Sequence, residues 1–250
     1  MFFLARGFLL VVLAAALLRA DDSLTHARRA QALLGTAVWS QVIRVENKAR
    51  FSRYPRTLHA LVFEFDGILW FYADKDGTQS FSLHPDRLAE EKADFGPLLR
   101  DIEPGFTRWN VVPDDAGESV AVRGTLPNGC FIESLFALRQ RLAHGEPVGR
   151  ARLLSYYGVT PGGRCGHTVL TWETADHVEV LDPEWPRKTR SFPKALDGDA
   201  LGLARTMEGG LVTNARWVPV DLPAAKTPLF AAAGPAAAFS AGARREAFMR

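Results

Sequence analysis

The chain has 250 residues and a formal net charge of +2, with 30 basic and 28 acidic side chains. This near balance argues against nucleic acid as a partner, because domains that bind nucleic acid usually carry a strong positive excess. The length is enough for one sizeable domain, or for a core with appendages.

The first 20 residues have the three parts of a secretory signal peptide. A short segment with the charge of Arg6 precedes an apolar run at 8–18, and Arg19-Ala20 then supplies a small residue before two acidic ones. The run is shorter than the about 20 residues that a membrane-spanning helix needs, so cleavage after Ala20 is favoured over an uncleaved anchor. We therefore expect a secreted or periplasmic protein with no stable membrane span after cleavage.

Residues 21–119 are expected to form an N-terminal region built around an antiparallel meander. Asp22 or Ser23 can cap a short helix that ends near Leu34. Apolar and β-branched runs follow, separated by Asp-Gly pairs that favour tight hairpin turns. The aromatic residues of these runs are interpreted mostly as core. The expected strands cover 38–45, 58–65, 68–72 and 79–83, the expected helices 87–93 and 97–102, and a polar turn covers 114–118.

Cys130 stands where a loop is expected to run into a helix. Pro127, Asn128 and Gly129 before it favour turns and helix caps, whereas the leucines after it recur at helical spacing as far as Leu142. A cysteine in the first turn of a helix faces unpaired backbone N–H groups and the positive end of the helix dipole, which favour the nucleophilic thiolate. A buried structural cysteine is the commoner alternative.

Two strand-like segments downstream, 167–173 and 177–182, predict a hairpin that brings a histidine to an aspartate. With a two-residue turn, His167 would lie directly opposite Asp182, with Cβ atoms about 4.5–5.5 Å apart. A carboxylate at that distance can orient an imidazole and hold its tautomer. A three-residue turn would shift the pairing by one residue and weaken this. Taken singly, His167 would be an ordinary surface histidine at a strand end, and Asp182 an ordinary turn residue that ends a strand. The presence of Cys130 upstream favours the catalytic interpretation of the pair.

The segments around this hairpin complete the expected order of elements. A strand is expected at 152–157, and the glycine-rich segment 158–166 is expected to be a mobile loop. A short helix weakened by two glycines is expected within 193–207, and a last strand at 211–220. Residues 223–250 are mostly Ala, Gly and Pro, which predicts a disordered tail.

Three motifs together resemble the transglutaminase-like core of the papain-like thiol enzymes. They are Gly129-Cys130-Phe131 opening a helix, Gly166-His167 opening a strand, and Leu181-Asp182-Pro183 ending the next strand. The resemblance covers about residues 120–186 and implies an α+β fold, in which a helix with the nucleophile packs on an antiparallel sheet with the base and its carboxylate. The predicted organisation is a signal peptide at 1–20, the N-terminal region at 21–119, the thiol-enzyme core at 120–222 and the tail at 223–250.

The function that this resemblance implies is cleavage or transfer at amide bonds, as a peptidase, an amidase or a crosslinking enzyme. Cys130 would attack the carbonyl, His167 would carry the proton and Asp182 would orient His167. The backbone N–H of Cys130 would be one oxyanion donor, and Asn128 is the only candidate offered for the second. The substrate would be a peptide or protein amide, and neither a cofactor nor a metal is implied.

Alternatives remain open at several points. The same fold could serve as a binding module without turnover. A similar Cys, Gly-His, Asp-Pro order occurs in the double-glycine peptidases of bacteriocin exporters, but those usually have a proline where Ile132 stands here. A zinc site from Cys130, Cys165, His167 and Asp182 is chemically allowed but lacks the usual ligand spacing.

Cys165 departs from the family pattern, because it lies two residues before His167. Two cysteines in a secreted chain would ordinarily form a disulfide, which would block a Cys130 nucleophile. We expect Cys165 within about 10 Å of Cys130 but unbonded in the active form, acting at most as a resolving thiol. A loop cysteine that points elsewhere is an equal alternative.

Overall fold

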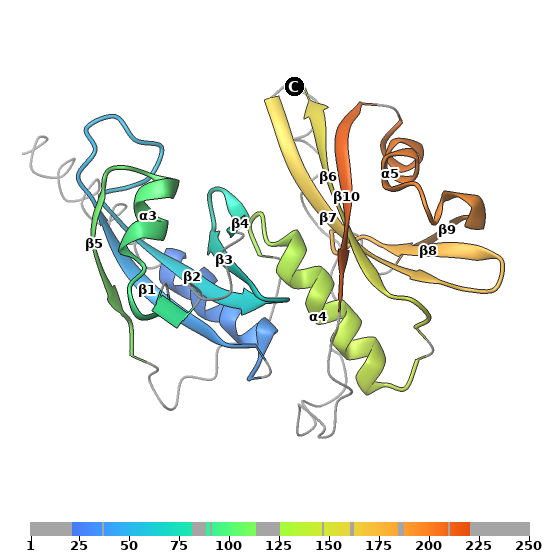
Figure 1. Cartoon of the computed structure of the whole chain (residues 1–250), viewed down its shortest axis with the longest axis horizontal. Coiled ribbons are helices and arrows are strands. Elements are labelled where there is room, and N and C mark those ends of the chain that lie inside the picture. The colour runs from blue at the N-terminus through green and yellow to red at the C-terminus, as the bar shows by residue number, and fades with distance from the viewer. Residues whose placement is uncertain are drawn as a thin grey trace, which may run out of the picture. The chain divides into compact units, whose positions relative to one another are not determined.

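A computed structural model describes residues 22–36, 38–81, 89–90, 92–113, 126–146, 148–160, 163–184, 188–209 and 211–220. The expected signal peptide, the polar turn at 114–118, part of the helix at 87–93 and the tail at 223–250 lie outside these residues. The chain divides into two compact units, Met1–Ile132 and Glu133–Arg250, and the division falls within the helix α4 (Cys130–Ala143). Each unit contains a five-stranded antiparallel sheet together with helices, so the fold is mixed α+β (Figure 1).

The sheet of the first unit has the strand order β4-β3-β2-β1-β5. Its first four strands are the predicted meander, which is confirmed. The fifth strand pairs with β1 at the far edge and was not predicted, because only Phe106 in it is buried and its other side chains are mostly exposed. The strands are β1 (Ser40–Asn47), β2 (Thr57–Phe65), β3 (Ile68–Ala73), β4 (Gly77–Phe81) and β5 (Phe106–Val111).

The turn between β2 and β3 shows why the Asp-Gly pair predicted the hairpin. Asp66 and Gly67 both have positive φ angles, 54° and 66°, and the flanking residues Phe65 and Ile68 are paired. Two consecutive left-handed residues match the twist of the strands, and aspartate and glycine tolerate this conformation better than other residues. The predicted two-residue turn is therefore confirmed.

Helices cover both faces of the first sheet (Figure 1). Helix α3 (Gly96–Ile102) buries Leu98 and Leu99 against the face that carries Ile43 and Phe71. On the other face, the helix of residues 22–34 lies against β2, where the hydroxyl of Ser23 accepts a hydrogen bond from the backbone N–H of His59. No helix in the described part of the chain is long and apolar enough to cross a membrane.

The sheet of the second unit has the strand order β10-β6-β7-β8-β9. Helix α5 (Ala200–Glu208) packs on one face through Leu203, Ala204 and Met207. Its first turn is capped by Asp199, whose carboxylate accepts the backbone N–H of Gly202. The strands are β6 (Arg152–Thr160), β7 (Gly163–Glu173), β8 (His177–Leu181), β9 (Thr189–Pro193) and β10 (Val212–Pro219), and a short 3-10 helix covers Lys194–Leu196.

The expected mobile loop at 158–166 is wrong. Strands β6 and β7 continue through this segment and pair as far as Thr160 opposite Gly163. Glycine lowers strand propensity, but here the ring of Tyr157 lies against Gly166, its partner across the ladder, where a Cβ atom would come within 3.1 Å of the ring. An aromatic side chain that covers a cross-strand glycine restores packing that the glycine itself cannot provide.

Candidate active site

A tight turn precedes α4 (Cys130–Ala143) and sets the position of its first residue. The backbone N–H of Gly129 donates to the carbonyl of Leu126 at 3.1 Å, and Asn128 adopts a left-handed conformation with φ of 53°. A Cβ atom on Gly129 would lie 2.3 Å from Cβ of Leu126, so only glycine fits there. The loop-to-helix junction predicted at Cys130 is therefore confirmed, with each turn residue in a defined role.

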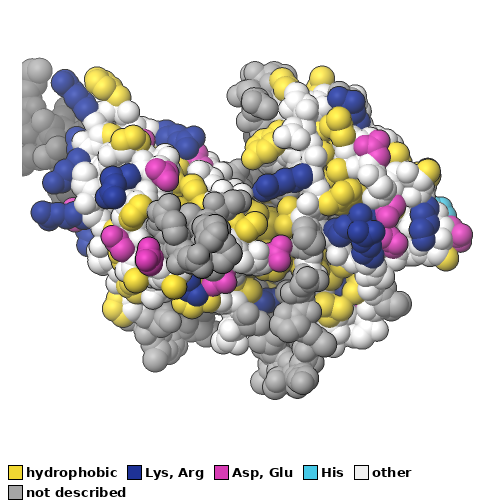
Figure 2. Space-filling model, in the orientation of Figure 1, with side chains coloured by type: hydrophobic (Ala, Val, Ile, Leu, Met, Phe, Trp, Pro, Cys, Tyr) yellow, Lys and Arg dark blue, Asp and Glu magenta, His cyan; other side chains and the backbone are white. Residues whose placement is uncertain are grey.

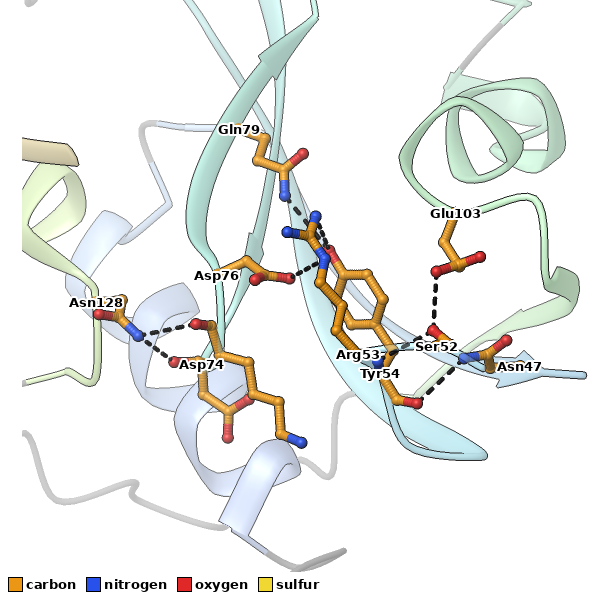
Figure 3. Close-up of polar contacts among 10 residues, drawn as sticks. Asn47, Ser52, Arg53, Tyr54, Asp74, Asp76, Gln79, Glu103 and Asn128 are labelled. Atoms are coloured by element: carbon orange, nitrogen blue, oxygen red, sulfur yellow. Dashed lines mark hydrogen bonds and ion pairs between the residues drawn. The ribbon is translucent and has the colours of Figure 1, made fainter. Parts of the chain in front are cut away.

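Two side chains attach this turn to the β3–β4 hairpin of the first unit. The amide of Asn128 donates to the backbone carbonyls of Asp74 at 2.8 Å and Lys75 at 3.1 Å (Figure 3). The hydroxyl of Tyr72 donates to the carbonyl of Pro127 at 3.0 Å. The Asn128 amide already donates both of its hydrogen bonds to the hairpin, which argues against its use as the second oxyanion donor.

Phe131, the residue after Cys130, holds the start of α4 in an aromatic cluster. Its ring stacks on Trp70 with centroids 4.1 Å apart and meets Phe65 edge-on at 6.0 Å. Phe131 is 1% exposed, and the indole N–H of Trp70 donates to the carbonyl of Phe65. The aromatic residues of the meander are core, as predicted, and part of that core fixes the first turn of α4.

Cys130 is the first residue of α4, is half-buried and is a free cysteine rather than half of a disulfide. One helical turn later, the buried hydroxyl of Ser134 donates to the backbone carbonyl of Thr168 at 3.1 Å. Residues four apart lie on the same face of a helix. Cys130 and Ser134 therefore share a face of α4, and Ser134 contacts the residue that follows His167 in β7.

His167 and Asp182 form a direct contact in the second unit. Nε2 of His167 lies 3.1 Å from Oδ1 of Asp182, and the two side chains are 17% and 14% exposed. A carboxylate only accepts, so Nε2 carries the proton of this hydrogen bond and Nδ1 is the basic nitrogen of the neutral ring. The same carboxylate oxygen accepts the backbone N–H of Glu184 at 2.9 Å, so Asp182 also closes the turn after β8.

The register that was predicted for this hairpin is wrong by two residues. Glu173 pairs with Val178, not with Asp176, because the turn comprises four residues closed by bonds between Thr174 and His177. A shift of two residues keeps every side chain on its original face, since the strand repeat is two. If the ladder continued by one more pair, Asp182 would lie opposite Val169. Asp182 would then be diagonal to His167 and on the same face of the sheet.

Opposing effects act on the carboxyl group of Asp182. Its burial raises the pKa, whereas the hydrogen bond and charge of His167, the Glu184 N–H and the charge of Arg190 lower it. The lowering effects prevail, so the pKa of Asp182 lies below its ordinary value. The carboxylate therefore remains charged at neutral pH and stabilises a protonated His167.

Tyr156 supports the imidazole from the neighbouring strand, a role that no motif indicated. It pairs directly with His167 across β6 and β7, and the two rings meet edge-on with centroids 5.6 Å apart. Its hydroxyl donates to Glu208 of α5 at 2.8 Å. Burial, followed by this bond and the charges of Glu208 and Asp182, raises the pKa of Tyr156 well above its ordinary value. The phenol thus stays neutral and holds the ring beside His167.

Cys165 lies in β7 opposite Gly158, but its side chain is outside the described part of the structure. Its expected closeness to Cys130 and its role as a resolving thiol therefore stay predictions. Among the described residues, no group of three or more His, Cys, Asp and Glu side chains is arranged to hold a metal ion.

Comparisons of the chain with protein-family models, with curated proteins and with solved structures found no match. The resemblance to transglutaminase-like thiol enzymes consequently rests on the three motifs alone and stays a prediction.

Proposed function

We propose that the protein is an exported cysteine enzyme of the transglutaminase-like kind, which cleaves or transfers acyl groups at amide bonds of peptides or proteins. Cys130 is the nucleophile, His167 the acid and base, and Asp182 the residue that orients His167. The observation that carries the proposal is the bond between His167 and Asp182, formed by two partly buried side chains. A histidine held this way by a carboxylate is the usual partner of an activated thiol.

The proposed reaction begins when Nδ1 of His167 takes the thiol proton of Cys130 and the resulting thiolate attacks the carbonyl carbon of an amide. The negative charge that develops on the carbonyl oxygen is stabilised by the backbone N–H of Cys130, which has no intrahelical acceptor at the start of α4. The carbon–nitrogen bond then breaks as His167 gives its proton to the leaving amine. Water or a second amine attacks the resulting thioester, and His167 takes up the proton that this attack releases.

One turn after Cys130, α4 contacts the strand that carries His167. Ser134, one turn after Cys130, binds the carbonyl of Thr168, and the imidazole belongs to the next residue along β7. The side chains of Thr168 and His167 point to opposite faces of the sheet.

Turnover of model substrates tests the proposal. The mature protein is incubated with peptides and with glutamine-containing proteins, with and without a fluorescent primary amine, and products are identified by mass spectrometry. Hydrolysis or amine incorporation by wild type, lost in Cys130→Ala and His167→Ala, is expected. Product formation that is equal in wild type and Cys130→Ala contradicts the assignment of the nucleophile. No product from any substrate, from protein that retains its fold, favours the binding module.

A further inference from the structure

The loop between β1 and β2, residues 48–56, concentrates positive charge at one end of the first unit. It contains Lys48, Arg50, Arg53 and Arg56 and no acidic residue, although the whole chain has a net charge of only +2. All four side chains are exposed. We call this segment the basic loop, and in Figure 2 dark-blue Lys and Arg side chains gather over the part of the first unit where Figure 1 draws it.

Hydrogen bonds at its base hold the basic loop in one conformation (Figure 3). The buried side chain of Asn47 donates to the carbonyl of Tyr54 at 3.2 Å and accepts the backbone N–H of Ala49 at 3.0 Å. The hydroxyl of Ser52 donates to Glu103 at 2.8 Å. The ring of Tyr54 packs on Phe106 with centroids 5.0 Å apart. The tip of the loop is therefore presented on a fixed base.

Phe51 is the most exposed of the large hydrophobic side chains at that tip, at 91%. Its only described neighbour of note is the guanidinium of Arg50, 5.5 Å from the ring centroid. A tethered loop that presents a full phenyl ring to water leaves apolar surface that a partner can bury. Arg50 precedes Phe51 in the sequence and Arg53 follows it closely. A partner that binds this segment therefore has to offer both an apolar region and negative charge.

Most of the charge of the basic loop is available to such a partner. Arg53 is paired with Asp76, with 3.5 Å between Nε and Oδ2. Lys48, Arg50 and Arg56 make no ion pair within the described residues. Two acids contact the loop: Asp76 pairs with Arg53, and Glu103 accepts the hydroxyl of Ser52. Three exposed cations of the loop that contains Phe51 thus have no ion-pair partner among the described residues.

We propose that the basic loop docks the protein on the surface of a bilayer that contains anionic phospholipids. Phe51 inserts between the head groups, and Lys48, Arg50 and Arg56 contact the lipid phosphates while their aliphatic parts lie along the interface. A lipid surface accounts for both features, whereas a soluble polyanion accounts for the cations and leaves the phenyl ring exposed.

Vesicle flotation tests the proposal with the chain from Asp21 onward, the mature form that the sequence predicts, which lacks the apolar run at 8–18. Binding is compared on vesicles of phosphatidylcholine alone and of an equimolar mixture with phosphatidylglycerol. Wild type is expected to bind the mixture and not the neutral vesicles. Replacement of Lys48, Arg50 and Arg56 by Gln lowers affinity about 100-fold, and Phe51→Ser lowers it about tenfold.

Matched controls lie in the second unit. Leu211 is 63% exposed, and Arg150, Lys188 and Arg216 are exposed cations. Leu211→Ser and the triple replacement of these cations by Gln are expected to bind like wild type, although the triple variant has the same net charge as the basic-loop variant. Equal losses in both triple variants contradict the proposal, because overall charge then explains binding. Full vesicle binding by Phe51→Ser also contradicts it, because the cations alone then account for binding and the ring does not insert.

Discussion

The imidazole of His167 and the carboxylate of Asp182 meet at 3.1 Å although the two residues are not directly opposite in their hairpin. Asp182 lies just beyond the end of β8, where it also accepts the N–H of Glu184. The turn after the strand therefore aims the carboxylate, and the register of the ladder only places it on the correct face. The contact between His167 and Asp182 should therefore depend on Asp182 itself and change little when the hairpin turn between β7 and β8 changes slightly.

Removing the charge of Asp182 is expected to change how stability depends on pH. The folded-state pKa of Asp182 is lowered, so the unfolded state binds more protons at acidic pH, and the contribution of the carboxylate is lost as pH falls. The loss begins near the unfolded value of about 3.9 and continues through the lower folded value. Urea unfolding should show that Asp182→Asn is less stable than wild type at neutral pH and that the difference shrinks on acidification.

Asp176→Asn is the control for that measurement, because Asp176 is exposed in the turn before β8. Its difference from wild type should be small at every pH. A difference between wild type and Asp182→Asn that stays constant from neutral to acidic pH would show that folding does not lower the pKa of Asp182.

Two substitutions at Tyr156 separate its two contacts. Tyr156→Phe removes the bond to Glu208, whose side chain is exposed and can bind water instead, so the loss of unfolding free energy should be about 0.5–1.5 kcal/mol. The ring against His167 remains, so reactivity of the proposed site should change little. Tyr156→Ala also removes the ring and should lower reactivity. Equal reactivity in the Phe and Ala variants would show that the edge contact does not position His167.

The aromatic cluster at the start of α4 is expected to be a major source of stability. Phe131→Ala leaves a cavity between Trp70 and Phe65 and should cost about 3–5 kcal/mol in urea unfolding. Phe51→Ala removes an equally large ring that is exposed, and should change stability by less than about 0.5 kcal/mol. Similar losses in the two variants would contradict the structural role given to Phe131.

The elements that the sequence predicted well are those with a local signal. Asp66-Gly67 specified a hairpin because both residues tolerate positive φ, and Cys130 was placed at a helix start because Asn128 and Gly129 favour a turn. Strand β5 had no such signal, because its position depends on backbone pairing with β1 rather than on an apolar pattern.

Features that depend on contacts between distant segments could not be read from the chain. The hydroxyl of Tyr156 reaches Glu208, 52 residues away, and nothing near either residue indicates the other. Gly158 and Gly166 suggested a loop, but both lie in a ladder, where the ring of Tyr157 covers Gly166 from the opposite strand. Asp182 was assigned from a turn length that was wrong, and its predicted contact with His167 is present because an error of two residues preserves the face.

The rate of alkylation of Cys130 by iodoacetamide, resolved by peptide mass spectrometry, tests the central assignment most directly. His167→Ala should slow the alkylation of Cys130 by about tenfold, because the imidazole favours the thiolate of Cys130. Equal rates for Cys130 in wild type and His167→Ala would contradict the proposal that the two residues act together.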